Sequence, residues 1–510
     1  MRITKYLLVF LCFIPLFVFR DFTPNNELKY LSIADEALRD GHFFTFWNHG
    51  VPYADKPPLY LWIVMLGKWL LGTHYMLFLG MFSLLPALGT LAVMERWVRP
   101  YLNEEYRTSA LMMMMTSGLF VGSAVVMRMD MLMCLFIVLA LYTFFKQYTR
   151  KAGKWDGVLL PVYIFLAVFS KGPVGVLVPL VSMATFLIWQ KKGRLFFRYM
   201  GWLQWGILLG LCAAWFGAVY AEGGNAYLNN LLFHQTVNRA VDAFHHKQPV
   251  WYYLKTIWYS LAPWVLFYFS AIYMGLRRQL LDTDVKKFFL VIITTTFIAL
   301  SIFSGKLDIY LLPIFPFIGY LAFLMLPDLP QRWLRVTVGI PAGILALAFP
   351  AYLAIMYRID LPAGISGLTV LALSGSAWVS LYFLFQKRIT QSANSLAIGL
   401  LITILIGSLI VCGLNAMIGF REMSQKAQTI AQEKGIENFY YYPFRSAENM
   451  DVYLKKEISP VNAEQLRSLS ERENFILFVR EKERLKNKEL QVITDGRESY
   501  SVGDYRIIVY

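Results

Sequence analysis

Residues 395–417 read SLAIGLLITILIGSLIVCGLNAM, an apolar stretch without a single acidic or basic side chain. A helix of roughly 20 apolar residues spans the hydrocarbon core of a membrane, with its backbone groups hydrogen-bonded inside the helix. The stretch therefore predicts a transmembrane helix. Comparable runs recur along most of the chain, which is the pattern of an α-helical polytopic membrane protein.

Windows of this kind predict about thirteen membrane helices. Their approximate extents are 4–20, 76–96, 108–126, 131–146, 157–170, 173–190, 201–220, 256–276, 288–303, 308–326, 334–356, 366–386 and 395–417. The first run has no small-residue cleavage motif at its end, so we expect it to remain as a helix and not to be removed as a signal peptide.

The composition agrees with this class and argues against nucleic-acid binding. The 510 residues are 57% hydrophobic and 16% charged, whereas soluble domains are about a quarter charged. The net charge of +15 is concentrated in short loops between apolar runs. Basic loops of this kind mark the cytoplasmic side of a membrane, and no basic stripe with a nucleic-acid-reading element is present in the sequence.

The charge pattern also predicts the domain organisation. With a cytoplasmic N-terminus in the inner membrane, residues 21–75, 221–255 and 418–510 are expected on the extracytoplasmic side. The predicted plan is a transmembrane domain over residues 1–417 with two long outward loops, followed by a soluble periplasmic domain over residues 418–510. Residues 33–38 in the first loop have the spacing of a short amphipathic helix lying on the membrane surface.

The tail has short elements in place of long apolar runs. Residues 437–442, 474–479 and 505–510 predict buried strands. Residues 462–473 have helical spacing, and Asn462 is a suitable N-cap. We therefore expect a small C-terminal α/β domain of roughly 90 residues.

Charged side chains gather in the first loop beside an aromatic-rich membrane edge: Glu27, Lys29, Asp55 and Lys56. A lysine offers a point charge for phosphate, and a carboxylate can hold a proton or a metal ion. The pattern favours a substrate with a phosphate head and an apolar tail. A plain connector with interfacial aromatics would use the same residue types, so these residues allow both interpretations.

Other outward segments also allow two interpretations. Arg128 and Asp130 are either functional groups or a charged turn that separates two helices. Lys306 either binds phosphate or extends its ammonium to the membrane interface. The Gly and Pro of residues 170–173 account first for a break between helices.

The loop 221–255 contains three of the six histidines, His234, His245 and His246. Neutral imidazole is a common metal ligand, but the chain has no tight two-histidine motif, so spacing leaves metal binding open.

Three motifs together resemble the GT-C glycosyltransferases of the protein-mannosyltransferase superfamily (glycosyltransferase family 39), and most of all its bacterial branch of lipid A aminoarabinose transferases. The motifs are Glu27-x-Lys29-Tyr30, residues 55–60 (DKPPLY), and residues 234–239 with 245–253. The resemblance covers roughly residues 1–420. It implies the GT-C fold and the transfer of a sugar from a polyprenyl phosphate to an acceptor on the extracytoplasmic face.

The resemblance also implies residue roles, position by position. Ligands of the lipid phosphate and substrate would be Lys29, Tyr30, Tyr53, Lys56, Arg239, Lys306 and Tyr310. Catalytic positions would be Asn26, Glu27 and Asp130. Asp55 and His234 would hold a divalent metal such as zinc, and no nucleotide cofactor is expected.

Three positions depart from the family pattern. Asn26 stands where an Asp is usual, Lys29 where an Arg is usual, and Asp55 where a Glu is more frequent. Asparagine cannot act as a general base. Either Glu27 or Asp130 takes that role, or the acceptor is already ionised, or the protein is weakly active.

The expected partners are the lipid-linked donor, membrane lipids and an acceptor, which is a lipid A-type glycolipid or a protein hydroxyl. We expect a monomer without nucleic acid. The alternative function is a transporter or flippase of lipid-linked substrates. Transporters usually carry ionisable groups near the bilayer midplane, whereas most charges here fall in loops or at helix ends.

Overall fold

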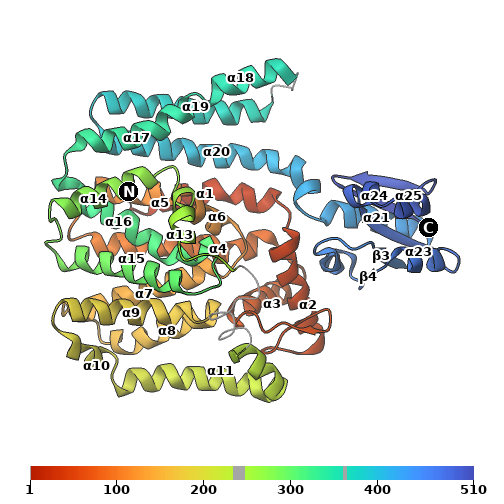
Figure 1. Cartoon of the computed structure of the whole chain (residues 1–510), viewed down its shortest axis with the longest axis horizontal. Helices are drawn as coiled ribbons and strands as arrows, with labels where there is room; N and C mark the ends of the chain where they lie inside the picture. The colour runs from red at the N-terminus through yellow and green to blue at the C-terminus, as the bar shows by residue number, and fades with distance from the viewer. Residues whose placement is uncertain (1, 234–246, 360–363) are drawn as a thin grey trace. The chain divides into compact units, whose positions relative to one another are not determined.

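The computed structural model describes residues 2–233, 247–359 and 364–510 (Figure 1). It is mainly helical, with a small β-sheet near the C-terminus. In the described residues, eight helices are long and apolar enough to cross a membrane, or up to eleven if each of three bent pairs is one span. The polytopic α-helical fold is confirmed, whereas the predicted count of about thirteen spans is not.

Two compact units interleave along the sequence. The first unit comprises Met1–Pro15, Ala54–Tyr60 and Leu77–Gly407. The second unit comprises Leu16–Tyr53, Leu61–Met76 and Ser408–Tyr510. The second unit thus joins most of the predicted first loop to the C-terminal part of the chain.

Most of the apolar helices lie in the first unit. They are α4 (Met76–Val98), α5 (Glu104–Met115), α6 (Gly118–Val125), α7 (Asp130–Tyr148), α8 (Asp156–Lys171), α9 (Val174–Trp189), α10 (Phe196–Tyr199), α11 (Trp202–Asn229), α13 (Tyr252–Ser260), α14 (Val265–Arg277), α15 (Asp284–Ile302), α16 (Phe315–Met325), α17 (Gln331–Ala346), α18 (Ala348–Ile359) and α19 (Ile365–Phe385). Short 3-10 segments are η2 (Gly193–Leu195), η4 (Asp308–Ile314) and η5 (Leu326–Asp328). Two further helices, α1 (Arg2–Phe19) and α20 (Ile389–Ile418), contribute residues to both units.

Two predicted spans are bent pairs of helices. Helices α5 and α6 meet at 69°, and α13 and α14 meet at 115°. At the first break, the hydroxyls of Thr116 and Ser117 donate hydrogen bonds to the carbonyls of Met112 (2.8 Å) and Met113 (2.9 Å). These side chains satisfy backbone acceptors where the helical pattern stops. Near the second break, Pro263 has no backbone N–H to offer a continuing helix.

Helix α8 packs against α7, α9 and α11, and Figure 1 shows these helices side by side in the first unit. The short connection between α7 and α8 reverses the chain direction. The start of α7 therefore lies at the end of α8, and this arrangement brings their terminal charged residues together.

The first loop is more helical than its polarity predicts. It contains the π-helical turn η1 (Pro24–Leu28), α2 (Lys29–Asp40), the strands β1 (Trp47–Asn48) and β2 (Val51–Pro52), and α3 (Leu59–Leu71). The predicted amphipathic helix is confirmed as α2, whose Leu31, Ile33 and Ala34 are fully buried. The apolar helix α3 was not expected inside the interval 21–75.

The C-terminal part begins with α21 (Arg421–Lys434) and forms a five-stranded sheet of order β4-β3-β5-β7-β6. The strands are β3 (Asn438–Tyr441), β4 (Ser459–Pro460), β5 (Phe475–Arg480), β6 (Ser499–Val502) and β7 (Tyr505–Val509). The other helices are η6 (Ala447–Met450), α22 (Asp451–Leu454), α23 (Ala463–Ser470), α24 (Glu481–Lys486) and α25 (Lys488–Thr494). Strand β5 is parallel to β3 and antiparallel to β7. The predicted α/β fold is confirmed.

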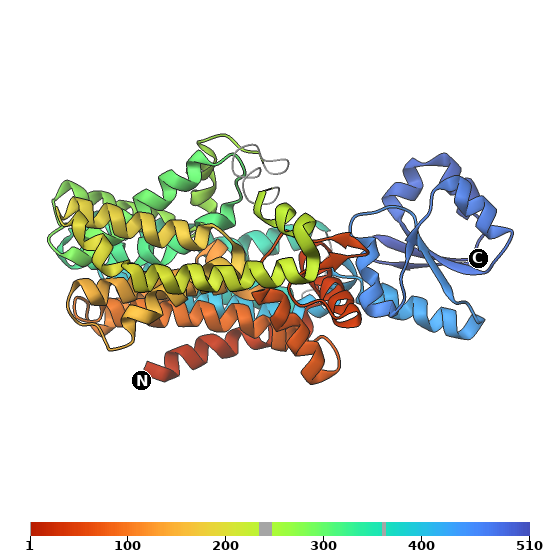
Figure 2. The same ribbon diagram turned by 90° about the horizontal axis from the view of Figure 1, so that it is seen from below.

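Helices cover both faces of this sheet (Figure 2). Phe475, Leu477 and Val479 of β5 form one core with Leu466 of α23 and Leu490 of α25. Alternate strand residues point to opposite faces, so the intervening buried residues of β5 face the other side, where α21 packs on β7. As predicted, Asn462 caps α23, accepting a hydrogen bond from the Gln465 backbone N–H at 2.8 Å.

Candidate functional site

The first loop buries one of the predicted catalytic carboxylates. Pro24 starts η1, and the Leu28 N–H donates to the Thr23 carbonyl at 3.0 Å, which closes the wide π-helical turn. Glu27 in this turn has no solvent exposure. Asn26 beside it is exposed, so the turn presents a neutral amide outward and holds its carboxylate inward.

The Glu27 carboxylate is bound by Arg20, the residue that follows α1. The two terminal nitrogens of Arg20 donate to its two oxygens, each at 2.7 Å. The Thr23 backbone N–H (2.8 Å) and hydroxyl (2.9 Å) donate to Oε2 as well. Such a bidentate, charge-assisted arrangement fixes the orientation of the carboxylate as well as its charge. We call Arg20, Thr23 and Glu27 the Glu27 turn.

Three predicted substrate ligands lie close to this turn in the second unit. The Lys29 ammonium is 4.6 Å from the centroid of the Tyr53 ring, so these two residues are brought together. This distance is suitable for a cation–π interaction. Tyr30 is buried at 3% exposure and packs as part of α2.

A second buried carboxylate, Asp130, lies at the first residue of α7 in the first unit. It forms ion pairs with the Lys171 ammonium at the last residue of α8 and with the Arg128 guanidinium (Nε to Oδ2, 3.0 Å). An acidic group at a helix N-terminus and a basic group at a helix C-terminus both complement the helix dipoles. The side chain of Lys171 is only 5% exposed.

Two other predicted ligands belong to the same group. The Lys171 ammonium lies 4.6 Å from the centroid of the Tyr310 ring. Lys56 is near enough to interact electrostatically with both Asp130 and Lys171. We call Lys56, Arg128, Asp130, Lys171 and Tyr310 the Asp130 cluster.

Lys306 is buried at 2% exposure and uses its ammonium to hold the chain. It donates to the carbonyls of Gln248 (2.9 Å) and Phe303. Burial lowers the pKa of this ammonium below its ordinary value. These two hydrogen bonds use two of the three donor hydrogens of the ammonium.

The metal assignment rests on one described residue. Asp55 is half-buried, whereas His234 and also Arg239 lie outside the described residues. Within the described parts of the chain, no group of three or more His, Cys, Asp or Glu side chains is arranged to hold a metal ion. The divalent-metal site therefore stays a prediction.

Sequence reasoning singled out Arg128 beside Asp130 but missed one pairing partner of each carboxylate. Arg20 was visible only as the end of the first apolar run, and Lys171 only as part of a helix break. Their signal in the sequence is a basic residue at the end of an apolar segment, which many membrane helices share. Arg20 contacts Glu27, 7 residues away in the sequence, and Lys171 contacts Asp130, 41 residues away. Only these contacts identify Arg20 and Lys171 as part of the site.

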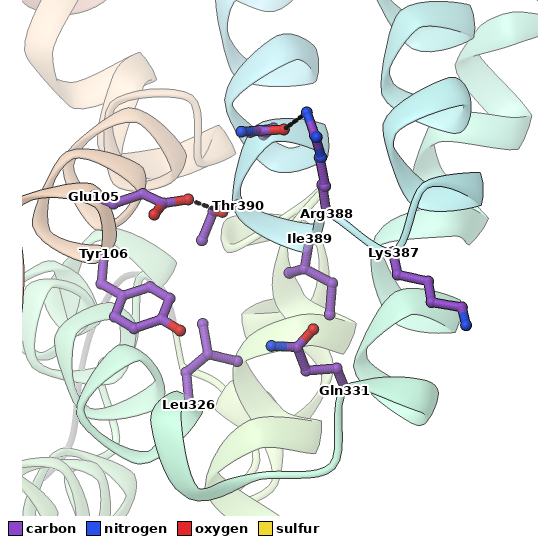
Figure 3. Close-up of a pocket in the computed structure, with 9 residues that line it drawn as sticks. Glu105, Tyr106, Leu326, Gln331, Lys387, Arg388, Ile389 and Thr390 are labelled. Atoms are coloured by element: carbon purple, nitrogen blue, oxygen red, sulfur yellow. Dashed lines mark hydrogen bonds between the residues drawn. The ribbon is translucent and has the colours of Figure 1, made fainter.

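A cavity of about 450 Å³ lies elsewhere in the first unit (Figure 3). Its lining comes from α5, η5, α17, the segment that connects α19 to α20, and the start of α20: Glu105, Tyr106, Leu326, Gln331, Lys387, Arg388, Ile389, Thr390 and Gln391. Glu105 is hydrogen-bonded to Thr390, and Arg388 to Gln391. None of the predicted site residues lines this cavity, and its charges are of both signs.

Comparison with known proteins gives the same relationship as the motifs. Residues 4–222 match the family described as dolichyl-phosphate-mannose-protein mannosyltransferase. The chain is 26% identical over 297 residues to the undecaprenyl phosphate-alpha-4-amino-4-deoxy-L-arabinose arabinosyl transferase of Edwardsiella ictaluri (strain 93-146), covering 57% of this chain and 53% of that protein. For the transferase of the same name in Yersinia pestis (strain Pestoides F), identity is 24% over 302 residues, covering 56% and 52%. The chain spans about half the length of these curated relatives.

The fold is similar to solved structures over nearly the whole chain. ArnT from Cupriavidus metallidurans bound to undecaprenyl phosphate has a TM-score of 0.77 at 16% identity, covering 99% of this chain and 97% of that chain. The archaeal oligosaccharyltransferase AglB from Archaeoglobus fulgidus has a TM-score of 0.52 at 11% identity, covering 99% and 73%. At these identities the likeness concerns the fold. The predicted resemblance to GT-C glycosyltransferases is thus confirmed.

Proposed function

We propose that this polytopic membrane protein is a glycosyltransferase that moves a sugar from a polyprenyl-phosphate donor to an acceptor on the extracytoplasmic face. The transferases of Edwardsiella ictaluri and Yersinia pestis carry undecaprenyl phosphate in their names, and ArnT was solved with it bound, which supports this donor class. In this proposal the N-terminus is cytoplasmic, and the loops 21–75 and 221–255 and the domain 418–510 are periplasmic. The lipid-linked sugar is itself the donor, so the reaction needs no nucleotide.

The Asp130 cluster carries the proposal. Arg128 and Lys171 form ion pairs with the buried carboxylate of Asp130, and Lys56 interacts with it electrostatically. These four groups carry three positive charges and one negative charge. Lys56 and Arg128 are partly exposed, and a cluster with three cations suits a phosphate that is bound and then released as an anion.

In the proposed reaction, the acceptor oxygen attacks the anomeric carbon of the sugar. The bond from that carbon to the phosphate oxygen breaks with inversion, and its electron pair stays on the departing lipid phosphate. Lys56 and the predicted ligand Arg239 stabilise the charge that develops there. Asp130 orients Lys171 and Arg128, and it keeps these cations from repelling one another. Asp55 and His234 are retained as predicted ligands of a divalent ion that would order the loop, and no step above depends on it.

The Glu27 turn favours an acceptor that is already ionised. Both oxygens of Glu27 accept hydrogen bonds from Arg20, and Asn26 cannot accept a proton as a base. A phosphate group of a glycolipid needs no base, whereas a protein hydroxyl does. We therefore propose a phosphate-bearing glycolipid as the acceptor, with a protein hydroxyl as the alternative.

The test is transfer by purified protein in detergent, with polyprenyl-phosphate sugars as donors and a membrane glycolipid extract as acceptor. Lys56→Ala should lower kcat/KM by about 10- to 100-fold, because a hydrogen bond to a charged group contributes about 1.5–3 kcal/mol. Lys151→Ala, at an exposed lysine of the α7–α8 connection, is the matched control and should leave transfer unchanged.

Equal activity of Lys56→Ala and wild type would refute the assignment of Lys56. Movement of the lipid donor across vesicles without any sugar transfer would support the transporter alternative instead.

A further inference from the structure

A buried carboxylate ties the first loop to the C-terminal domain within the second unit. Asp21 is the second residue after the end of helix α1, and it is 1% exposed. The Tyr453 hydroxyl donates to its Oδ1 at 2.5 Å, and the Arg421 backbone N–H donates to its Oδ2 at 2.9 Å. The Arg421 guanidinium lies 3.4 Å from Oδ1. A buried charge is tolerated only with such partners, so both chain segments are held to it.

Arg421 also lies between rings of the two segments. Its guanidinium carbon is 5.9 Å from the centroid of Phe22 in the first loop and 5.7 Å from the centroid of Tyr453. Both distances are within the range of cation–π contacts. The same arginine thus binds the first loop through charge and through aromatic contact.

The end of α20 fits closely against the same point. The Asn415 side chain accepts from the Asp21 N–H at 2.9 Å and donates to the Phe19 carbonyl at 2.7 Å. At Gly419 an added Cβ atom would collide with the Asp21 carboxylate, so a larger residue would displace it. The contact of Asp21 with the end of α20 therefore requires a small residue at position 419.

Further hydrogen bonds hold the first loop within η1 and after it. The Ser446 hydroxyl donates to Asn25 at 2.8 Å, directly before Asn26. The Ser32 hydroxyl of α2 donates to Asp451 at 2.8 Å. The C-terminal domain thus holds the first loop before, within and after the turn that carries Glu27.

The chain connects this contact directly to Glu27. Arg20 precedes Asp21, and one of its terminal nitrogens is 3.4 Å from the Asp21 carbonyl oxygen. Both terminal nitrogens of Arg20 donate hydrogen bonds to the Glu27 carboxylate. A shift of Asp21 would therefore move the Arg20 backbone and change the orientation of the Glu27 carboxylate.

We propose that the C-terminal domain positions the Glu27 turn for sugar transfer, with Asp21, Tyr453 and Arg421 as positioning residues. This inference rests on the proposed function, and it gives the domain a role in catalysis without a reactive group of its own. The Glu27 turn leads directly into Lys29, a predicted ligand of the lipid phosphate, and mispositioning of a group that acts in the transition state lowers kcat more than it changes substrate affinity.

The decisive variant is Tyr453→Phe, which removes one hydroxyl and keeps the ring. The matched control is Tyr440→Phe, which removes a hydroxyl that donates to Glu473 at 2.8 Å inside the C-terminal domain. Both full-length proteins are compared with wild type by sugar transfer and by hydrogen–deuterium exchange of backbone amides 21–31. Asp21→Asn is a second variant of the same contact.

For Tyr453→Phe we expect faster exchange over residues 21–31 and a fall in kcat of about tenfold, with little change in KM for the donor. Tyr440→Phe should show neither effect. Unchanged exchange in Tyr453→Phe would overturn the inference, and so would faster exchange with wild-type kcat. Absence of transfer in wild type would instead refute the proposed function, and exchange alone would then decide whether Tyr453 holds the turn.

Discussion

Arg20 donates hydrogen bonds to both carboxylate oxygens of Glu27, each at 2.7 Å, and Glu27 has no solvent exposure. A buried charge that loses its partner costs about 3–5 kcal/mol. Arg20→Ala should therefore lower the melting temperature strongly and abolish transfer. Arg20→Lys keeps the charge but loses the two-pronged geometry, so it should lie between Arg20→Ala and wild type.

These effects can be measured by thermal unfolding in detergent and by the transfer assay. If Arg20→Ala and Arg20→Lys were equally stable, the paired geometry would have no importance at this position.

The Asp130 cluster should respond unequally to loss of its members. Asp130→Asn leaves both Lys171 and Arg128 without their buried counter-charge, whereas Lys171→Met leaves Asp130 with Arg128. Asp130→Asn should therefore be the more destabilising of the two, by an amount approaching about 3–5 kcal/mol. The double variant should cost less than the sum of the single variants, because the two residues are in contact.

A double-mutant cycle on thermal or denaturant unfolding checks this. The exposed pair Arg467 and Glu489, at 3.0 Å, is the control and should couple by no more than about 1 kcal/mol. Additive effects of the Asp130 and Lys171 changes would show that their contact is not maintained in the protein.

Asn26 offers a test of the acceptor. It is exposed beside the buried Glu27, so Asn26→Asp should fold normally. With a phosphate acceptor the new carboxylate repels the substrate, and transfer should stay the same or fall. With a hydroxyl acceptor a new base could raise transfer by a factor of about 10² or more.

Side-by-side assays with a phosphate-bearing glycolipid and a serine-containing peptide distinguish these cases. A large gain on the peptide alone would contradict the phosphate acceptor that we propose.

The contact of Asp451 with the first loop should depend on pH. Burial raises the pKa of the Asp451 carboxyl to about 6, although the neighbouring His49 and the hydrogen bond from Ser32 act in the opposite direction. A carboxyl with a raised pKa favours the folded state most when it is protonated. Its contribution is present below the unfolded-state pKa, about 4, and is lost as the pH rises through about 6.

Asp451→Asn removes this titration. The difference in melting temperature, variant minus wild type, should therefore increase as the pH is raised from 4.5 to 7.5. A difference that is constant or that decreases with pH would show that Asp451 does not titrate in this way.

Much of the fold follows from the sequence because lipid imposes simple rules. Residues 395–417 could be assigned to a membrane helix from composition alone, and α20 contains them. The amphipathic spacing of residues 33–38 identified α2, and the cap at Asn462 located α23. Helix α3 was missed because its apolar run of 13 residues is too short for the membrane-span criterion.

The candidate site could be predicted only in part. The charges Glu27, Lys29, Lys56 and Asp130 could be selected from the sequence because charged groups are costly beside a membrane and rarely occur there without a role. The partners Arg20 and Lys171 could not be selected, because an arginine or lysine at the end of an apolar run is ordinary.

The sequence by itself determined the polytopic helical class, the helices α2 and α20, the α/β nature of the C-terminal domain and the charged positions worth testing. Only the tertiary structure decided that Arg20 neutralises Glu27, that Lys171 meets Asp130, and that Tyr453 reaches Asp21 over 432 residues of chain. The physical reason is that periodicity and hydropathy indicate which face of each segment is buried against lipid or against a protein core. A buried ion pair instead depends on which helix ends are packed together.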